Sequence, residues 1–225
     1  EQLKKMLPYF DKKEQVAIMF VYDSIIRSPT ELFSLQVKDI YIENNEVWVN
    51  IPNNIAKTFG RKFNLLYCGD ELMLYIKKNK LQDDDYLFDF SYVVFTKKIK
   101  KVAKQVFGNK ISHTKAGGLF SDLTLYDLRH SGAINLRILA SKNGKISLDA
   151  IRQRGGWTDF TMLNYYTKFI GLDGHIKKSE LTIQEDKTKL DKIEKKVERL
   201  QELLLEKTFG KTDVTPEERI RAEKI

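Results

Sequence analysis

The sequence predicts an α+β protein that is mainly helical and carries one small antiparallel β-sheet. Apolar residues recur every three or four positions over most of the chain, which is the period of an amphipathic helix. Residues 37–66 differ, because they contain short apolar runs that are separated by the pair Asn44-Asn45. Asparagine tolerates the left-handed backbone of a tight turn, so this pair predicts a hairpin between two strands.

The expected elements follow in chain order. Residues 1–26 are expected to be helical, with a break at Pro8, because proline ends or kinks a helix. Pro29 and Glu31 favour the start of another short helix, since proline suits a first turn and an acid complements the helix dipole there. The strands are expected at residues 37–42, 47–51 and 61–66. Further helices are expected at residues 70–80, 91–107, 123–140, 148–154 and 159–169.

The composition excludes several classes of protein. The chain has 225 residues, of which 42% are hydrophobic, so it is able to bury a sizeable core. Its single cysteine, Cys68, excludes an internal disulfide framework and a multi-cysteine zinc site. No apolar run approaches the ~20 residues of a membrane-spanning helix, and no signal-peptide pattern opens the chain. We therefore expect a cytoplasmic protein with no membrane partner.

The charge distribution points to a polyanionic partner. The 39 Lys and Arg residues exceed the 31 Asp and Glu residues, which gives a net charge of +8. No acidic residue occurs from Phe90 to Ser121, where Lys97, Lys101 and Lys104 share one face of an expected helix. A field of this sign attracts nucleic acid, the commonest polyanion in a cell. A lysine-rich surface that only keeps the protein in solution is the alternative.

Four short stretches, far apart in the chain, contain residues suited to phosphodiester chemistry. They are Arg27 ahead of Pro29-Thr30-Glu31-Leu32, Lys57 in the turn at residues 56–62, Tyr126 with Leu128-Arg129-His130-Ser131, and Gly155-Gly156-Trp157 followed by Tyr165-Tyr166-Thr167. At these positions the sequence resembles the catalytic domain of the tyrosine recombinase (phage-type integrase) family, over about residues 10–170. That family has an arginine before a Ser/Thr-Glu-Leu segment, a hairpin lysine, a His-x-x-Arg box and a His or Trp after glycine. In the family the nucleophilic tyrosine follows nine residues after that His or Trp. Here Tyr166 follows Trp157 by nine residues.

The sequence departs from the family pattern at two positions. Tyr126 stands where the second box usually has histidine, and Glu31 follows Arg27 by four residues, where three are more usual. Two alternatives therefore stay open. One is a non-catalytic DNA-binding protein with the same fold, and the other is DNA relaxation of the type IB topoisomerase kind, whose chemistry uses nearly the same residues.

The resemblance implies how the reaction would be divided among the residues. Attack on a DNA phosphodiester places negative charge on its non-bridging oxygens, which the planar guanidinium groups of Arg27 and Arg129 would bind. Tyr166 would be the nucleophile and would form a 3′-phosphotyrosyl bond. Lys57 would deliver a proton to the leaving 5′-oxygen.

Two aromatic residues complete the expected site. Trp157 would donate its indole N–H to a phosphate oxygen, and Tyr126 would hydrogen-bond the phosphate or orient Arg129. Because the phosphotyrosine conserves bond energy and arginines supply positive charge, the resemblance implies no cofactor, neither a metal ion nor a nucleotide triphosphate. The residues expected to bind DNA outside the catalytic set are Lys62, Lys97, Lys101 and Lys104.

Each of these residues also has an ordinary structural interpretation. For Arg129 it is an ion pair with Asp122 or Asp127. For Lys57 it is a backbone-phosphate contact, which Arg61 or Lys62 of the same turn would make equally well. For Trp157 it is a core position, and for Tyr166 and its neighbour Tyr165 it is helix packing.

The expected domain organisation is a catalytic domain at residues 1–174 and a charged helical tail at residues 175–225. In the tail, an apolar seam at helical spacing is formed by Leu190, Ile193, Val197, Leu200 and Leu204. Several members of the family use such a helix to reach a neighbouring protomer, and a solvated charged helix is the alternative. The resemblance implies double-stranded DNA as the partner and a homo-oligomer, with four protomers on DNA.

Two further expectations concern the origin of the chain. The family usually has an amino-terminal DNA-clamping domain, whereas this chain begins almost at the catalytic domain. We expect either a fragment of a longer protein or a protein that clamps DNA only when assembled. The lysine-rich, alanine-poor composition suggests a mobile element of an archaeon or a low-GC host.

Overall fold

The computed structural model describes residues 2–111, 118–143, 146–169 and 197, and of residues 143 and 166–169 it describes the backbone alone. The chain divides into two units, residues 1–175 and 176–225. Val197 is the one described residue of the second unit, so the apolar seam expected at residues 190–204 otherwise lies outside the described residues.

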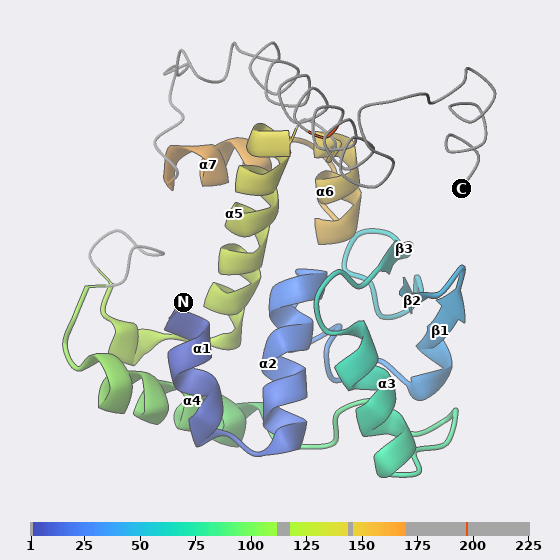
Figure 1. Ribbon diagram of the computed structural model, residues 1–225, viewed down its shortest axis with the longest axis horizontal. Helices are drawn as coiled ribbons and strands as arrows, with labels where there is room; N and C mark the ends of the chain where they lie inside the picture. Colours follow the sequence, from blue (N-terminus) through green and yellow to red (C-terminus); the bar gives the residue numbers. More distant parts are fainter. Residues whose placement is uncertain (1, 112–117, 144–145, 170–196, 198–225) are drawn as a thin grey trace, which may run out of the picture. The chain divides into compact units, whose positions relative to one another are not determined.

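The described part of the first unit is mainly helical and contains a small sheet, as the sequence predicts (Figure 1). Its α-helices are α1 (Gln2–Met6), α2 (Lys12–Ser24), α3 (Gly69–Lys78), α4 (Tyr92–Phe107), α5 (Leu125–Asn143), α6 (Leu148–Gly155) and α7 (Thr161–Phe169). Short 3-10 helices are η1 (Leu7–Tyr9), η2 (Val37–Asp39) and η3 (Phe120–Asp122). The strands are β1 (Ile40–Glu43), β2 (Glu46–Ile51) and β3 (Arg61–Asn64). None of the described helices is both long enough and apolar enough to cross a membrane.

The ends of α2 are determined by residues close in sequence. Pro8 lies in η1, at the predicted break. Asp11 then caps α2, because its carboxylate accepts a hydrogen bond from the Glu14 N–H at 2.9 Å and the Glu14 carboxylate accepts one from the Asp11 N–H at 3.0 Å. At the other end, Ile25 adopts a left-handed backbone with φ 48°, which ends the helix just before Arg27.

The short helix predicted to start at residues 29–31 is wrong, because residues 28–34 form hydrogen-bonded turns. The Glu31 N–H donates to the Arg27 carbonyl four residues back, whereas the Ser34 N–H donates to the Glu31 carbonyl three residues back, so the pattern of an α-helix is not continued. The Glu31 carboxylate folds back and accepts the Arg27 backbone N–H at 2.7 Å. This side chain therefore stabilises a turn in place of a helix.

The sheet is antiparallel, with strands in the order β1-β2-β3. Asn44 and Asn45 form the predicted turn between β1 and β2, with φ angles of 51° and 61°. Ile40 pairs with Val49, and Val49 pairs with Phe63, so these side chains share the buried face. The first strand begins later than predicted, because η2 occupies its first three residues.

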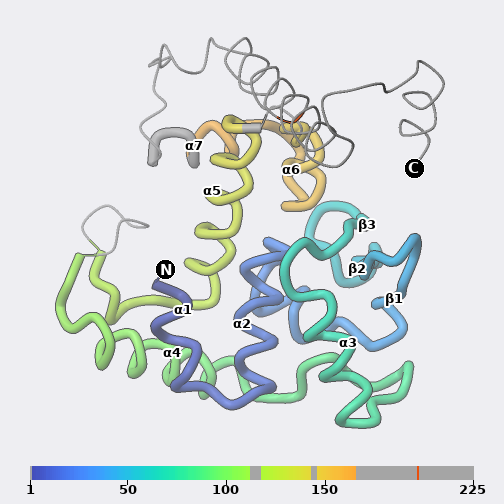
Figure 2. Tube along the Cα trace, in the orientation of Figure 1, coloured from blue at the N-terminus to red at the C-terminus, as the bar shows by residue number. Residues whose placement is uncertain are grey.

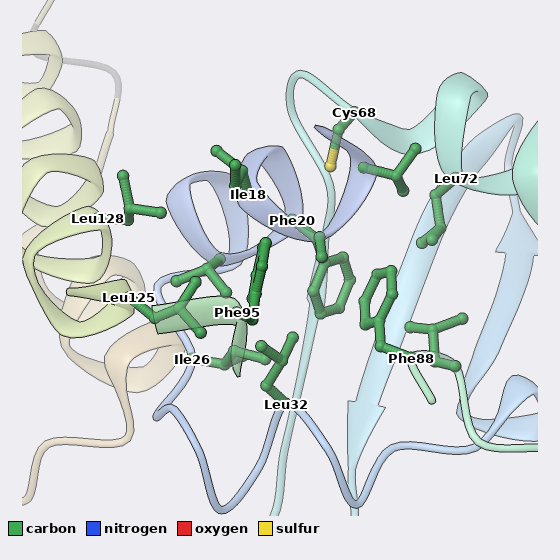
Figure 3. Packing of buried hydrophobic residues seen from close by; sticks show 14 of the residues in the cluster. Ile18, Phe20, Ile26, Leu32, Cys68, Leu72, Phe88, Phe95, Leu125 and Leu128 are labelled. Atoms are coloured by element: carbon green, nitrogen blue, oxygen red, sulfur yellow. The ribbon is translucent and has the colours of Figure 1, made fainter. Parts of the chain in front are cut away.

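Two groups of buried side chains hold the first unit together. The larger group packs around α2 and includes Ile18, Phe20, Leu72, Phe88 and Phe95 (Figure 3). The smaller group lies where α5 meets α6 and α7, and includes Ile25, Leu136, Ile151, Trp157 and Leu163. Helix α5 connects the two, because it also packs closely on α2 (Figure 2). Gly132 permits this approach, since a Cβ there would lie 2.0 Å from the Tyr22 carbonyl oxygen.

Candidate active site

The predicted arginines meet at the carboxyl end of α6. This helix ends at Gly155, and Gly156 follows in the left-handed conformation with φ 63°. The last carbonyls of an α-helix lack partners within the helix and carry the negative end of its dipole. Here the consecutive carbonyls of Arg154, Gly155 and Gly156 each accept a hydrogen bond from a different guanidinium group.

The three donors come from distant parts of the sequence. Arg61 Nε lies 2.9 Å from the Arg154 carbonyl oxygen. Arg129 Nη2 lies 2.7 Å from the oxygen of Gly155, and Arg27 Nη2 lies 2.7 Å from the oxygen of Gly156. The structure therefore brings Arg27 and Arg129, which the sequence predicts to share a phosphate, onto adjacent residues of one helix end.

Arg129 is the more deeply buried of the two, at 1% exposure. Its Nη1 donates to the carbonyl of Ile25, and its guanidinium carbon lies 5.1 Å from the centre of the Trp157 ring. Ile25 is the residue with φ 48°, a conformation that β-branched residues rarely adopt. Nη1 and Nη2 of Arg129 thus donate to main-chain carbonyls of two distant segments, which orient the guanidinium.

The Arg27 guanidinium is hydrogen-bonded through Nη1 and Nη2. Its Nη1 lies 3.2 Å from Glu31 Oε1 and 3.5 Å from Thr58 Oγ1, and its side chain keeps 16% of its exposure. No described residue accepts a hydrogen bond from its Nε. This N–H is therefore available to a ligand as far as the described residues are concerned.

Glu31 is fully buried and binds two guanidinium groups. Arg61 takes both carboxylate oxygens, with Nη1 3.0 Å from Oε1 and Nη2 2.7 Å from Oε2. Burial by itself raises the pKa of Glu31, but the hydrogen bonds and charge of Arg61, with those of Arg27, outweigh it and hold the pKa below its ordinary value. Glu31 is thus an anion inside the site, next to Arg27.

Arg61 is buried and is the ion-pair partner of Glu31, whereas the sequence left a phosphate contact open for it. Lys57 and Lys62 are the exposed cations of this turn. The turn is tied to the arginines through Thr58, whose Oγ1 donates to the Gly156 carbonyl at 2.8 Å. Lys57 therefore precedes a residue that is bound to the same carbonyl as Arg27.

The predicted aromatic residues differ in their surroundings. Trp157 is a core residue, as its ordinary interpretation has it, and its ring also packs on Arg129. Tyr126 is exposed and packs edge-on against His130, with ring centres 4.4 Å apart. The structure shows no hydrogen bond from Tyr126 to Arg129, so a role in orienting that arginine stays a prediction. Tyr166 lies within α7, and its side chain is outside the described residues.

The predicted DNA-binding lysines of α4 lie on its exposed face. Lys97, Lys101 and Lys104 are exposed, while the opposite face buries its apolar residues. Lys98, one position further round the helix, instead forms an ion pair with Glu14. Helix α4 packs on α1 and η3, so these lysines belong to a surface separate from the end of α6.

Sequence reasoning missed a second buried ion pair next to the site. Arg154 Nη2 lies 2.8 Å from Asp23 Oδ1, and both groups are buried. The Asp23 carboxylate also accepts the backbone N–H groups of Leu66, Tyr67 and Cys68, which lead into α3. For Arg61 a sequence signal existed, because its position in β3 alternates with exposed Lys62 and matches buried Phe63. A cation on the inward face of a strand requires a buried partner.

The site gathers the guanidinium groups of Arg27, Arg61 and Arg129 around the end of α6, with one carboxylate, that of Glu31. Within the described ranges there is no group of three or more His, Cys, Asp or Glu side chains that would hold a metal ion. Such an arrangement is suited to binding a phosphate group, since guanidinium forks match its oxygens.

Comparison with solved structures identifies the fold. XerH site-specific recombinase in a post-cleavage complex with palindromic difH substrate is 18% identical, with a TM-score of 0.52 over 75% of this chain and 48% of that chain. XerA recombinase is 19% identical, with a TM-score of 0.53 over 80% of this chain and 58% of that chain. This chain thus spans about half the length of the recombinases that it matches. The fold is that of a tyrosine recombinase catalytic domain.

The family follows from the sequence match. Residues 1–169 match the phage integrase family. The chain therefore belongs to the phage integrase family. A search of curated protein sequences gave no significant match.

Proposed function

We propose that this chain is the catalytic part of a site-specific recombinase or integrase, which cleaves and rejoins double-stranded DNA through a 3′-phosphotyrosyl intermediate. One observation carries the proposal: Arg27 and Arg129 are held on adjacent carbonyls of α6, and the turn with Lys57 is bound to one of them. Two oriented guanidinium groups and an exposed amine suit a phosphodiester exchange.

The arginines act on the charge that develops at phosphorus. The carbonyls orient both guanidinium groups before DNA arrives, so little reorganisation is needed when the non-bridging oxygens gain charge. Arg27 offers its Nε–H, which no described residue uses. Trp157 keeps the Arg129 plane in place by packing on it and serves as the further donor to the phosphate.

Tyr166 is the proposed nucleophile. A phenol has a pKa of about 10 in water, and two adjacent guanidinium groups favour its phenolate. The phenolate oxygen bonds to phosphorus while the bond from phosphorus to the 5′-oxygen breaks, and Lys57 gives that oxygen a proton. Rejoining reverses these steps, so neither water nor a nucleotide triphosphate is consumed.

The remaining predicted residues serve DNA binding and assembly. Tyr126 is proposed to contact the same phosphate, and Lys62, Lys97, Lys101 and Lys104 are proposed to bind the DNA backbone. The tail at residues 175–225 is proposed to join protomers into the assembly, a tetramer on DNA. The XerH structures support a DNA partner, because they are complexes with difH substrate before and after cleavage.

Trapping on nicked DNA tests the proposal. Wild type, Tyr166→Phe and Tyr165→Phe are incubated with a pool of labelled duplexes that carry a nick and random sequence on both sides of it. After cleavage near the nick, the short fragment with the free 5′-hydroxyl diffuses away, so the covalent adduct is trapped. We expect a covalent protein–DNA adduct with wild type and with Tyr165→Phe, and none with Tyr166→Phe. Tyr165 is the matched control, because it is the adjacent residue of α7 and has the same side chain.

Two outcomes would contradict the proposal. Duplex binding without an adduct in any variant would show a DNA-binding protein that does not cleave. Relaxation of a supercoiled plasmid without strand exchange between the sites selected from the pool would show a topoisomerase.

A further inference from the structure

We propose that Arg61 is a positioning residue for the reaction: through the Glu31 carboxylate it keeps the Arg27 guanidinium free to bind the scissile phosphate. This inference rests on the proposed function, and it assigns a role to a residue that is too buried to contact DNA. Three observations carry it: the sharing of Glu31, the net charge of the cluster and the crowding over Gly156.

The two arginines share the Glu31 carboxylate unequally. Arg61 binds both oxygens with a two-pronged contact at 3.0 Å and 2.7 Å, and its side chain is 3% exposed. The Arg27 guanidinium reaches only Oε1, at 3.2 Å, while the Arg27 backbone N–H donates to Oε2 at 2.7 Å. A two-pronged guanidinium–carboxylate contact is the stronger and more directional of the two. Glu31 is therefore occupied mainly by Arg61, and Arg27 is a secondary partner.

The charge of the cluster depends on Arg61. Arg27 and Glu31 alone would form a neutral pair, and an anionic phosphate would gain little from approaching it. With Arg61 the three side chains carry a net charge of +1. A buried carboxylate that lacks this partner would compete with DNA for the donors of Arg27, because an unpaired charge away from water is strongly unfavourable.

Gly156 shows that the two guanidinium groups are packed together. A Cβ built on this residue would lie 2.9 Å from Nη1 of both Arg27 and Arg61. Arg61 Nε is also bound to the Arg154 carbonyl, two residues before the carbonyl that holds Arg27. The position of Arg61 therefore determines the space that Arg27 occupies.

Arg154 provides a matched reference within the same fold. It is a buried arginine that binds a buried carboxylate, Asp23, at 2.8 Å, and its other hydrogen bonds go to the carbonyls of Asp23 and Asn64. None of these groups is a side chain of the proposed site. Arg154→Gln removes a comparable buried ion pair and keeps the main-chain carbonyl that holds Arg61.

The test is a double-mutant cycle on single-turnover cleavage at saturating DNA, well below the melting temperature of each variant. We expect Arg27→Ala to lower the rate about 1000-fold and Arg61→Gln about 30-fold. The two losses should not multiply, so that the Arg27→Ala/Arg61→Gln variant stays within about threefold of Arg27→Ala. Arg154→Gln should cost less than about fivefold and should multiply with Arg27→Ala. Multiplying losses for Arg61, or equal losses for Arg61→Gln and Arg154→Gln, would overturn the assignment.

A charge-removal variant separates positioning from folding. In Arg61→Gln the Glu31 carboxylate is left to Arg27, so adding Glu31→Gln should restore cleavage about tenfold. A purely structural role for Arg61 predicts a further loss instead. If Arg61→Gln does not fold, Arg61→Lys keeps the charge without the two-pronged contact and should lower the rate about fivefold at unchanged DNA affinity; an unchanged rate would contradict the proposal.

Failure of the proposed function gives a different result from failure of this inference. If wild type forms no adduct, the same cycle is measured on the affinity for duplex DNA. Losses of affinity by Arg27→Ala and Arg61→Gln that do not multiply would then keep the positioning role, and losses that multiply would overturn it.

Discussion

Glu31 and Asp23 are two fully buried carboxylates of the same unit, and each is paired with a buried arginine. Around Asp23, the remaining lone pairs are taken by main-chain N–H groups at the start of α3. Around Glu31, a second guanidinium, that of Arg27, takes part in the contact. The Asp23 pair is therefore neutral, whereas the Glu31 cluster keeps one positive charge.

This difference separates a structural ion pair from a site. Neutral amides complete the hydrogen bonding of Asp23 and join α2 to the segment before α3, and the Arg154 guanidinium is buried against groups of the fold. Arg27 retains a donor and part of its exposure because Arg61 already satisfies Glu31. The same kind of ion pair thus serves folding at Asp23 and, in our proposal, anion binding at Glu31, according to which groups occupy the remaining positions around each carboxylate.

The largest expected effect concerns the structural pair. Asp23→Ala leaves Arg154 buried without its counter-ion and frees three amides, and should lower the free energy of unfolding by about 3–5 kcal/mol. Urea unfolding followed by circular dichroism measures this. Cleavage per folded molecule should stay within about threefold of wild type. A loss of stability below about 1 kcal/mol would mean that the pair does not hold α3 in place.

A smaller effect is expected where the Glu31 cluster meets α6. Gly156→Ala forces a side chain into a left-handed backbone and against the Arg27 and Arg61 guanidinium groups, so cleavage should fall about 30-fold. Gly108→Ala is the control, because Gly108 also has a positive φ, 61°, but has nothing within 4 Å of a Cβ. Both variants should lose stability, and only Gly156→Ala should lose cleavage beyond that. Equal cleavage rates for the two variants would show that crowding at Gly156 has no influence on Arg27.

The smallest expected effect is a pH dependence of stability. The folded protein holds the pKa of Glu31 below its ordinary value of 4.5, so the unfolded chain takes up this proton first as the pH falls. The stabilisation by Glu31 is complete above that ordinary value and is lost as the pH falls through the folded pKa. Urea unfolding of wild type and Glu31→Gln between about pH 6 and pH 3 should show the stability difference shrinking toward low pH. A constant difference would contradict the charged state assigned to Glu31.

Much of the secondary structure could be predicted from local patterns. The Asn44-Asn45 turn and the helix that became α4 were recognisable because turn chemistry and helical spacing depend on neighbours in the chain. The helix expected to start at residues 29–31 does not form, and its absence depends on a residue that is distant in the chain. The Glu31 carboxylate of this segment binds Arg61, which lies in β3.

The candidate site divides in the same way. Motif order predicted that Arg27 and Arg129 lie together, and the structure places both at the end of α6. The catalytic roles of these arginines, of Lys57 and of Tyr166 stay predictions, and the side chain of Tyr166 lies outside the described residues. Thr58 and the carbonyls of Gly155 and Gly156 could not be assigned, since a main-chain acceptor has no sequence signature. Asp23 and Arg154 were missed for a related reason, because their pairing depends on a contact between α2 and α6.

The amino-acid sequence by itself determined the class of protein: an α+β member of the phage integrase family, with its basic residues in a recognisable order. Periodicity, turn residues and motif spacing are local properties, so they can be recognised without coordinates. Only the tertiary structure decided that Arg61 pairs with Glu31 and Arg154 with Asp23. It also left Arg27 with an Nε–H to which no described residue is bound. That outcome depends on which groups lie within hydrogen-bonding distance after α6 packs against the turns at Arg27 and Lys57, and no local pattern encodes that proximity.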